Sequence, residues 1–265
     1  GGPVAGRTRG SPAMTRVLNS LGAIAFALGL IGAWQLAADR GLVSPIFFPS
    51  PGRTFAELWR QIAEGRLWEP LGATAWRMVL GWIVASIAGV AIGAAIGLSR
   101  RAQDYLEPLL EFVRPLPASA IIPVAVLFLG LSTQMSTAVI AFGSIWPVLL
   151  AAVHGFKSIE PRLYEVSAAL RFTRSQHLLK IALPAALPDI LAGVRVGLGI
   201  ALILAVVTEM QASLPGLGQN ILLAQRSFRS PELYAGVVML GVLGFVANQL
   251  VLGIERKLLR WRDAG

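Results

Sequence analysis

Few side chains in this 265-residue sequence are of types that do acid–base, nucleophilic or metal chemistry. There is no cysteine, which excludes thiolate catalysis, disulfides and Cys-ligated metals. The two histidines, His154 and His177, are far apart, and neither an H-E-x-x-H nor a P-loop pattern occurs. No Ser-His-Asp arrangement is evident. The sequence therefore predicts no catalytic site, no metal and no cofactor bound by this chain.

Two ionisable residues, Arg195 and Glu209, lie inside otherwise apolar runs. A charge there is unfavourable unless it has a partner or faces water. Arg195 is fourteen residues before Glu209, roughly 21 Å along one helix and too far to pair with it. We expect Glu209, next to Met210, to accept hydrogen bonds from the loop around Pro215–Gly218 and to shape an outer gate. The alternative is that its charge lies in the substrate's path.

The composition is that of a membrane protein: 55% of the residues are hydrophobic and 14% are charged, against about 25% charged in soluble domains. The apolar residues form runs long enough to cross a bilayer, which takes about 20 helical residues. We expect an all-α integral membrane protein with six spans in residues 17–254. The spans are placed near 17–38, 71–98, a broken segment ending near 131, 135–154, 189–213 and 234–254.

Prolines interrupt the third span. A break is expected at Pro115 and Pro117, with a helix containing Ser119 and Pro123 after it. Prolines leave backbone carbonyls free, which membranes tolerate only against protein or water. We therefore place these four residues beside a translocation pathway, facing a second copy of the chain. The alternative is a kink that only shapes the bundle.

Lysine and arginine set the orientation. With both termini inside, fifteen of the 23 basic residues fall in inner segments and six in outer ones. Such an excess of basic residues is typical of cytoplasmic segments. The tails 1–16 and 255–265 and the segment 158–184 are then cytoplasmic. This distribution also accounts for the net charge of +9, so no nucleic-acid partner is expected.

Two further patterns concern packing. Residues 53–65 form an amphipathic pattern, predicting a helix in the outer interface that is apolar at Phe55, Leu58, Trp59 and Ile62, with Trp59 and Trp68 as anchors in the lipid. Small residues recur every four positions in the first, second and fifth spans, which favours close helix packing. These series are Ala25, Gly29, Ala33 and Ala37; Gly81, Ala85, Gly89, Gly93 and Gly97; and Gly193, Gly197, Ala201 and Ala205.

The cytoplasmic segment 158–184 is polar and helix-forming. A first helix is expected over 158–172, capped by Ser158 with Pro161 in its first turn. A second short helix, 175–182, is expected to end before Pro184. Two short amphipathic helices on a membrane surface are suited to docking in a groove of a soluble partner.

The same segment resembles the cytoplasmic signature of permeases of binding-protein-dependent ABC importers. Counting from Glu165, the signature places small residues next, Gly at the seventh position, Ile at the seventeenth and Leu-Pro at the nineteenth and twentieth. This sequence has Arg171 in place of the Gly, and we expect it to need a different backbone path at that turn. The resemblance marks as contacts of the ATPase Glu165, Ala169, Leu170, Arg171, Ile181, Leu183 and Pro184.

Other stretches are similar to the sulfonate, taurine and nitrate branch of these permeases, among them FPSPGRTFAELW, TEMQASLPGLGQNILLAQ and ERKLLRWR. The resemblance implies the type I ABC importer fold in a bacterial inner membrane. The partners it implies are two ATPase subunits that bind ATP and Mg, a second permease copy, an external substrate-binding protein and membrane lipid. The implied substrate is a small organic or inorganic anion; an ATP-independent carrier or channel is the alternative.

Overall fold

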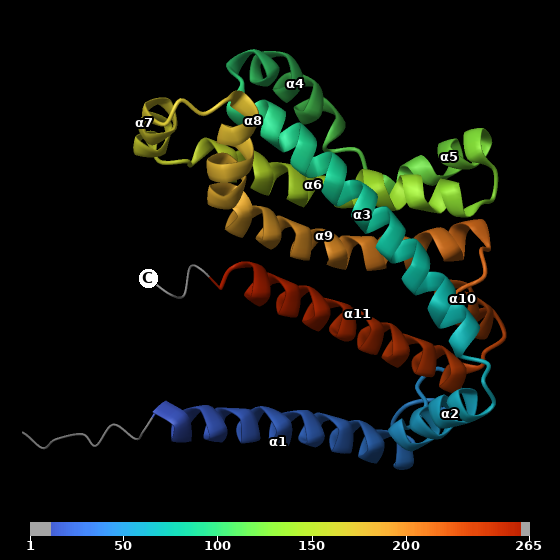
Figure 1. The fold of residues 1–265 in the computed structure, drawn as a ribbon. Coiled ribbons are helices and arrows are strands. Elements are labelled where there is room, and N and C mark those ends of the chain that lie inside the picture. Colours follow the sequence, from blue (N-terminus) through green and yellow to red (C-terminus); the bar gives the residue numbers. More distant parts are fainter. Residues whose placement is uncertain (1–11, 261–265) are drawn as a thin grey trace, which may run out of the picture.

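The computed structural model describes residues 12–260, and every regular element in that part of the chain is helical (Figure 1). The predicted tails lie partly outside it, at residues 1–11 and 261–265. The elements are, in order, α1 (Pro12–Asp39), α2 (Pro51–Ala63), α3 (Trp68–Leu98), α4 (Arg100–Val113), η1 (Ala118–Ile121), α5 (Ile122–Leu129), α6 (Thr133–Lys157), α7 (Pro161–Ala169), α8 (Arg174–His177), η2 (Leu178–Ala182), α9 (Leu183–Ala212), α10 (Leu217–Arg226) and α11 (Ser230–Leu258).

The helices confirm the predicted membrane fold. Five are long and apolar enough to cross a bilayer: α1, α3, α6, α11, and α8 continued through η2 into α9. The sixth crossing is the bent pair of α4 with η1 and α5, whose two arms meet at 82°. The break falls at the loop that holds Pro115 and Pro117, where it was expected. Helix α1 begins earlier than the predicted start at residue 17.

Close packing of α3, α6 and α9 forms the centre of the bundle. A Cβ atom built on Gly93 of α3 would lie 2.5 Å from the Cβ of Ala152, and one on Gly193 of α9 would lie 2.5 Å from the Cβ of Ala151. Neither position has room for a side chain. The small-residue series of the second and fifth spans therefore lie against α6 of the same chain, which lets the three backbones approach.

Helix α1 lies apart from this bundle (Figure 1). No residue of Gly22–Asp39 is buried, and Gly29 has no atom within 4 Å of its Cβ position. Its anchor is at the far end, where the Trp34 indole N–H donates to the carbonyl of Pro49 at 2.9 Å. Gly29 of the first-span series thus has no close neighbour among the described residues, unlike Gly93 and Gly193 of the other two series.

Helix α2 forms close to the predicted range. Ser50 caps it by accepting a hydrogen bond from the N–H of Arg53. Leu58 and Ile62 pack against a buried cluster of Leu67, Leu217 and Met239, but Phe55 and Trp59 are exposed. The predicted apolar face is therefore half wrong: Leu58 and Ile62 turn to the protein, while Phe55 and Trp59 turn outward.

The bundle places two groups of residues at opposite ends (Figure 1). One end carries α7, α8, the start of α4 and the end of α11. The other carries α2, α10 and the turn between α5 and α6. By the distribution of basic residues, the first end is the cytoplasmic one.

Candidate coupling surface and outer ion-pair cluster

The first cytoplasmic helix, α7, is shorter than predicted. It begins at Pro161 after Glu160, which provides no side-chain cap. Ser158 instead ends α6: its N–H donates to the carbonyl of His154 at 2.9 Å and its hydroxyl to that of Gly155 at 3.1 Å. The predicted N-cap was wrong because α6 extends to Lys157, so that Ser158 is the C-cap of that helix. Pro161 does occupy the first turn, where a missing N–H removes no bond.

Arg171 ends α7 in a left-handed conformation, with φ of 51°. Its N–H donates to the carbonyl of Ala168, and the N–H of Phe172 donates to that of Ser167, both at 3.0 Å. This pair of bonds is the Schellman motif, which usually has Gly at the left-handed position. The expectation of a different backbone path was therefore wrong. Arginine takes the conformation suited to glycine, at a steric cost of roughly 1–2 kcal/mol.

The second cytoplasmic helix is not a separate element. Thr173 caps α8 through a reciprocal box with Gln176, and the chain then passes through the π-helical turn η2 directly into α9. Pro184 therefore does not stop a helix, and the continuous helix of the fifth span begins at Arg174 rather than at residue 189. The prediction failed because the wider π turn before Pro184 relieves the clash between its ring and the carbonyl four residues earlier.

Helix α7 is attached to the body through one face. The Ser167 hydroxyl and the His177 Nδ1 atom are 3.0 Å apart, and the rings of Tyr164 and His177 lie 4.9 Å apart. Leu163 packs against a cluster that includes Phe156 and Ala182. These contacts hold α7 against α8 and the end of α6.

The seven predicted coupling residues divide into two sets. Glu165, Ala169, Leu170 and Arg171 are exposed on α7 and its terminal turn. Leu170, at 59% exposure, is a large apolar side chain that the described residues leave uncovered. The other three, on η2 and the first turn of α9, are half-buried: Ile181, Leu183 and Pro184. The first set can contact another protein, and the second packs within the chain.

At the opposite end, Glu209 lies in a cluster of hydrogen-bond donors. Its side chain has no exposed surface. One carboxylate oxygen accepts from the Arg77 Nη1 atom at 2.8 Å. The other accepts from the Thr74 hydroxyl at 3.0 Å and from the N–H of Gly218 at 2.9 Å. The buried charge is thus paired and hydrogen-bonded, as such charges must be. We call Thr74, Arg77, Glu209 and the loop 213–218 the outer cluster.

The loop of the outer cluster is folded back over the end of α9. Arg77 also donates to the carbonyl of Pro215 at 2.6 Å, and the N–H of Leu217 donates to the Thr74 hydroxyl at 2.9 Å. A Cβ atom on Gly216 would lie 2.2 Å from the Cδ of Glu209. Only glycine leaves room for the carboxylate at this position, which is extended and therefore unstrained.

The backbone donor to Glu209 is the one that the sequence predicts; the gate role stays a prediction. Sequence reasoning did not assign Arg77 as the partner, and it missed Thr74. Both lie on α3, three residues apart, so they share one face of that helix. Because Thr74 and Arg77 are far from Glu209 in sequence, no local pattern indicated the contact. The available signal was that a buried carboxylate needs a cation, and that Arg77 is an arginine beside the outer end of a neighbouring span.

The predicted pathway residues lie around the bent third crossing. Pro115 and Pro117 are exposed in the loop before η1, Ser119 is half-buried on η1, and Pro123 is exposed in the first turn of α5. Ile122 beside it packs with Ala212 and Leu214 at the end of α9. The start of α5 therefore touches the loop that follows Glu209, while Pro115 and Pro117 do not belong to the outer cluster. Met210, next to Glu209, is half-buried.

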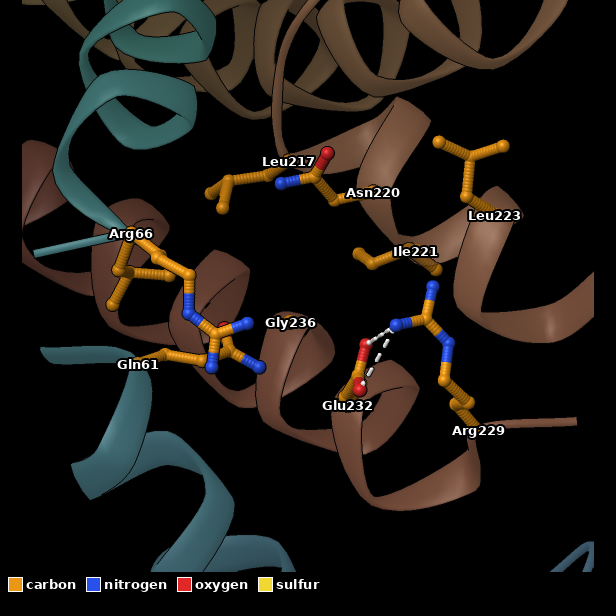
Figure 2. A pocket seen from close by; sticks show the side chains of 10 residues that line it. Gln61, Arg66, Leu217, Asn220, Ile221, Leu223, Arg229, Glu232 and Gly236 are labelled. Atoms are coloured by element: carbon orange, nitrogen blue, oxygen red, sulfur yellow. Dashed lines mark hydrogen bonds and ion pairs between the residues drawn. The ribbon is translucent and has the colours of Figure 1, made fainter. Parts of the chain in front are cut away.

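A hollow of about 290 Å³ opens beside the outer cluster, between α2, α10 and α11 (Figure 2). Arg66 and Gln61 line one side. Arg229 lies on the other side and pairs with Glu232 at 2.9 Å. Leu217 lines the hollow with its side chain, while its N–H bonds to Thr74. The hollow and the outer cluster thus share one residue.

The fold is that of a multi-pass helical membrane protein, with the exposed helix α7 at the cytoplasmic end and a buried ionic cluster at the opposite end. Residues 71–260 match the family described as binding-protein-dependent transport system inner membrane component. The chain belongs to this family, whose members are permeases of ABC importers of the bacterial inner membrane.

Relatives with related names align over most of the chain. An aliphatic sulfonates transport permease protein of Bacillus subtilis is 34% identical, covering 89% of this chain and 85% of its own. The taurine transport system permease protein of Escherichia coli is 29% identical, with coverage of 94% and 92%. The bicarbonate transport system permease protein of Synechococcus elongatus is 27% identical, with coverage of 89% and 88%.

A solved structure supports the fold. The methionine ABC transporter MetNI, in an inward-facing conformation, matches with a TM-score of 0.63 over 72% of this chain and 95% of its own, at 18% identity. The likeness confirms the type I importer permease fold that the sequence predicts.

Proposed function

We propose that this chain is the translocation subunit of an ATP-driven importer for a small anion. It works as a pair of permease copies with two ATPase subunits and an external binding protein. ATP and Mg are held by the ATPase, and this chain breaks no bond. The proposal is supported most by the exposed face of α7, which leaves Leu170 uncovered by the described residues at the cytoplasmic end.

The coupling step follows from how α7 is attached. Its inner face is held by Ser167 and His177 against α8, which continues without a break into α9. A force applied to Glu165, Ala169, Leu170 or Arg171 is therefore transmitted along one helix of 39 residues. That helix ends at Ala212, three residues beyond Glu209 of the outer cluster. Closure of an ATPase dimer would thus move the cytoplasmic end of the helix whose other end holds the proposed gate.

The outer cluster acts in this scheme as the closed gate. Arg77, on α3, joins the end of α9 and the loop at Pro215 by two hydrogen bonds. Opening the outer end separates these elements, so the cluster holds the chain closed until the coupling helix moves. The hollow of Figure 2 lies at the same end, where the binding protein would deliver its substrate.

The substrate class rests on the relatives, whose names include aliphatic sulfonates, taurine and bicarbonate. All three are transported as small molecules that carry an anionic group, and two of them are sulfonates. We therefore propose a small anion, with sulfonates first, as the solute carried by this chain. In this family the binding protein, which selects the solute before delivery, is a separate chain.

Co-purification tests the assembly. The full chain carrying an affinity tag is expressed with an ABC ATPase subunit from the same organism, and the extracted complex is analysed by native mass spectrometry. The proposal predicts two copies of each subunit. A chain that is purified alone, and that moves a sulfonate across a liposome membrane without any ATPase, would instead identify an ATP-independent carrier or channel.

A further inference from the structure

A second cavity lies within the membrane region, on the side of α9 that faces α11. It has a volume of about 210 Å³ and lies between α3, α9 and α11. It is separate from the outer hollow and from the coupling face, and nothing in the proposed mechanism uses it. Its lining consists of Met78, Arg195, Leu198, Gly199, Leu202, Gly244, Ala247 and Asn248.

The polar groups of this cavity gather at one end. Arg195 and Asn248 are its two polar lining residues. Arg195 forms an ion pair with Glu255, near the cytoplasmic end of α11. Its Nε atom is nevertheless buried with no hydrogen-bond partner among the described residues. An arginine side chain carries five N–H donors, so the pair with Glu255 leaves donors for another acceptor.

The rest of the cavity is apolar. Leu202 lies seven residues beyond Arg195 on α9, about 10 Å toward the centre of the membrane. Met78 and Gly244 line the same deeper part. A Cβ atom on Gly199 would meet no atom within 4 Å, so the space beside it is open. The cavity is therefore lined by a cation and an amide at its cytoplasmic end and by apolar side chains toward the centre of the membrane.

We propose that this cavity binds an amphiphile with one anionic head group and a short alkyl chain. The head group accepts hydrogen bonds from Arg195 and Asn248, and the chain extends past Gly199 toward Leu202. Two sources supply this chemistry: an alkanesulfonate solute, in which case the inference rests on the proposed function, or an anionic phospholipid of the inner leaflet that places its phosphate and the start of one acyl chain in the cavity. Glu255 competes with the head group for the guanidinium.

Neutralising the two partners of the ion pair should change the affinity for the ligand in opposite directions. Arg195→Gln removes the cation and should weaken binding of hexanesulfonate by about tenfold, since hydrogen bonds from charged groups are the strong ones. Glu255→Gln removes the competing anion and should strengthen binding severalfold. A pair that served only to join α9 and α11 would give no gain in affinity when Glu255 is neutralised.

Substitutions at two glycines, one in the cavity and one outside it, test the apolar part of the cavity. Gly199→Leu places a side chain in the cavity from a position where the added Cβ meets no atom within 4 Å, and should abolish binding while leaving the ion pair intact. Gly241→Leu is the control: its Cβ position on α11 is also open, but Gly241 does not line the cavity. Both variants should fold alike, so a difference between them reports occupancy of the cavity.

Binding is measured by calorimetry on the full chain in nanodiscs, first in phosphatidylcholine alone and then with phosphatidylglycerol added. Hexanesulfonate bound equally in both lipids identifies a soluble anion as the ligand. Phosphatidylglycerol that blocks hexanesulfonate, and that stays with the wild-type chain but not with Arg195→Gln in native mass spectrometry, identifies a lipid. The proposal is overturned if neither probe binds, or if Gly199→Leu and Arg195→Gln bind as the wild type does. Transport is not the readout, so a failed importer and a failed cavity remain distinguishable.

Discussion

Glu209 and Arg77 form a buried ion pair in which each side chain needs the other. Replacing one partner leaves an uncompensated buried charge, which costs about 3 kcal/mol or more. We expect Glu209→Gln and Arg77→Gln each to lower the free energy of unfolding and the transport rate, with substrate preference unchanged.

The double variant Arg77→Gln/Glu209→Gln is the informative control, because it removes both charges. Its stability, measured by thermal unfolding in detergent, should exceed that of either single variant. Two fully additive losses would contradict the pairing. A Glu209→Gln protein that gains preference for neutral over anionic solutes would show instead that this charge lies in the substrate's path.

At the scale of single residues, contacts between residues close in sequence were predictable, and contacts between residues distant in sequence were not. The loop of Pro215–Gly218 was expected to fold back on Glu209 because its two glycines lie within nine residues of that side chain. Arg77 could not be assigned as the partner, since 132 residues separate the two side chains. Arg171 was misjudged for another reason: the hydrogen bonds of the Schellman turn outweigh the strain of a left-handed arginine.

Helix α7 provides the clearest prediction at the scale of elements. Leu170 is exposed and packs against no described core cluster, so Leu170→Ala should leave folding intact. It should lower substrate-stimulated ATP hydrolysis by the complex, because an apolar anchor in the ATPase groove is lost. Leu42→Ala, which truncates a still more exposed leucine at the other end of the molecule, serves as the control, and its complex should hydrolyse ATP normally. If both variants behave like the wild type, α7 is not the docking element.

The bent third crossing can be tested by labelling, because the chain contains no cysteine. A Ser119→Cys variant should react with a water-soluble maleimide in at least one nucleotide state if η1 lines the pathway. Ser144→Cys, at a position on α6 with no exposed surface, should stay unlabelled. Ser119→Cys that never reacts would place η1 in the bundle or in lipid.

Element types were predictable from apolar runs and prolines, but their junctions were not. The sequence motif Leu183-Pro184 looks like a helix stop, yet a π turn lets α8 continue into α9. Ser158 looks like an N-cap and ends the preceding helix. In both cases the outcome depends on how far the neighbouring helix extends, and that is decided by packing rather than by the local residues.

At the scale of the whole molecule, the six crossings and their family were predictable, while the position of α1 was not. Its small residues resemble those of α3 and α9, but only the latter two series meet α6. Periodicity reveals which face of a helix can pack closely, and it does not reveal which partner the face will meet.

The central claim is that ATP hydrolysis by a partner drives an anion inward through this chain. It is tested most directly by uptake of radiolabelled taurine into proteoliposomes that contain the chain and its ATPase, with the binding protein outside and ATP enclosed. The account predicts uptake against a gradient that requires enclosed ATP, the ATPase and the binding protein, and that Leu170→Ala reduces. Uptake that proceeds equally without ATP or without the ATPase would contradict it.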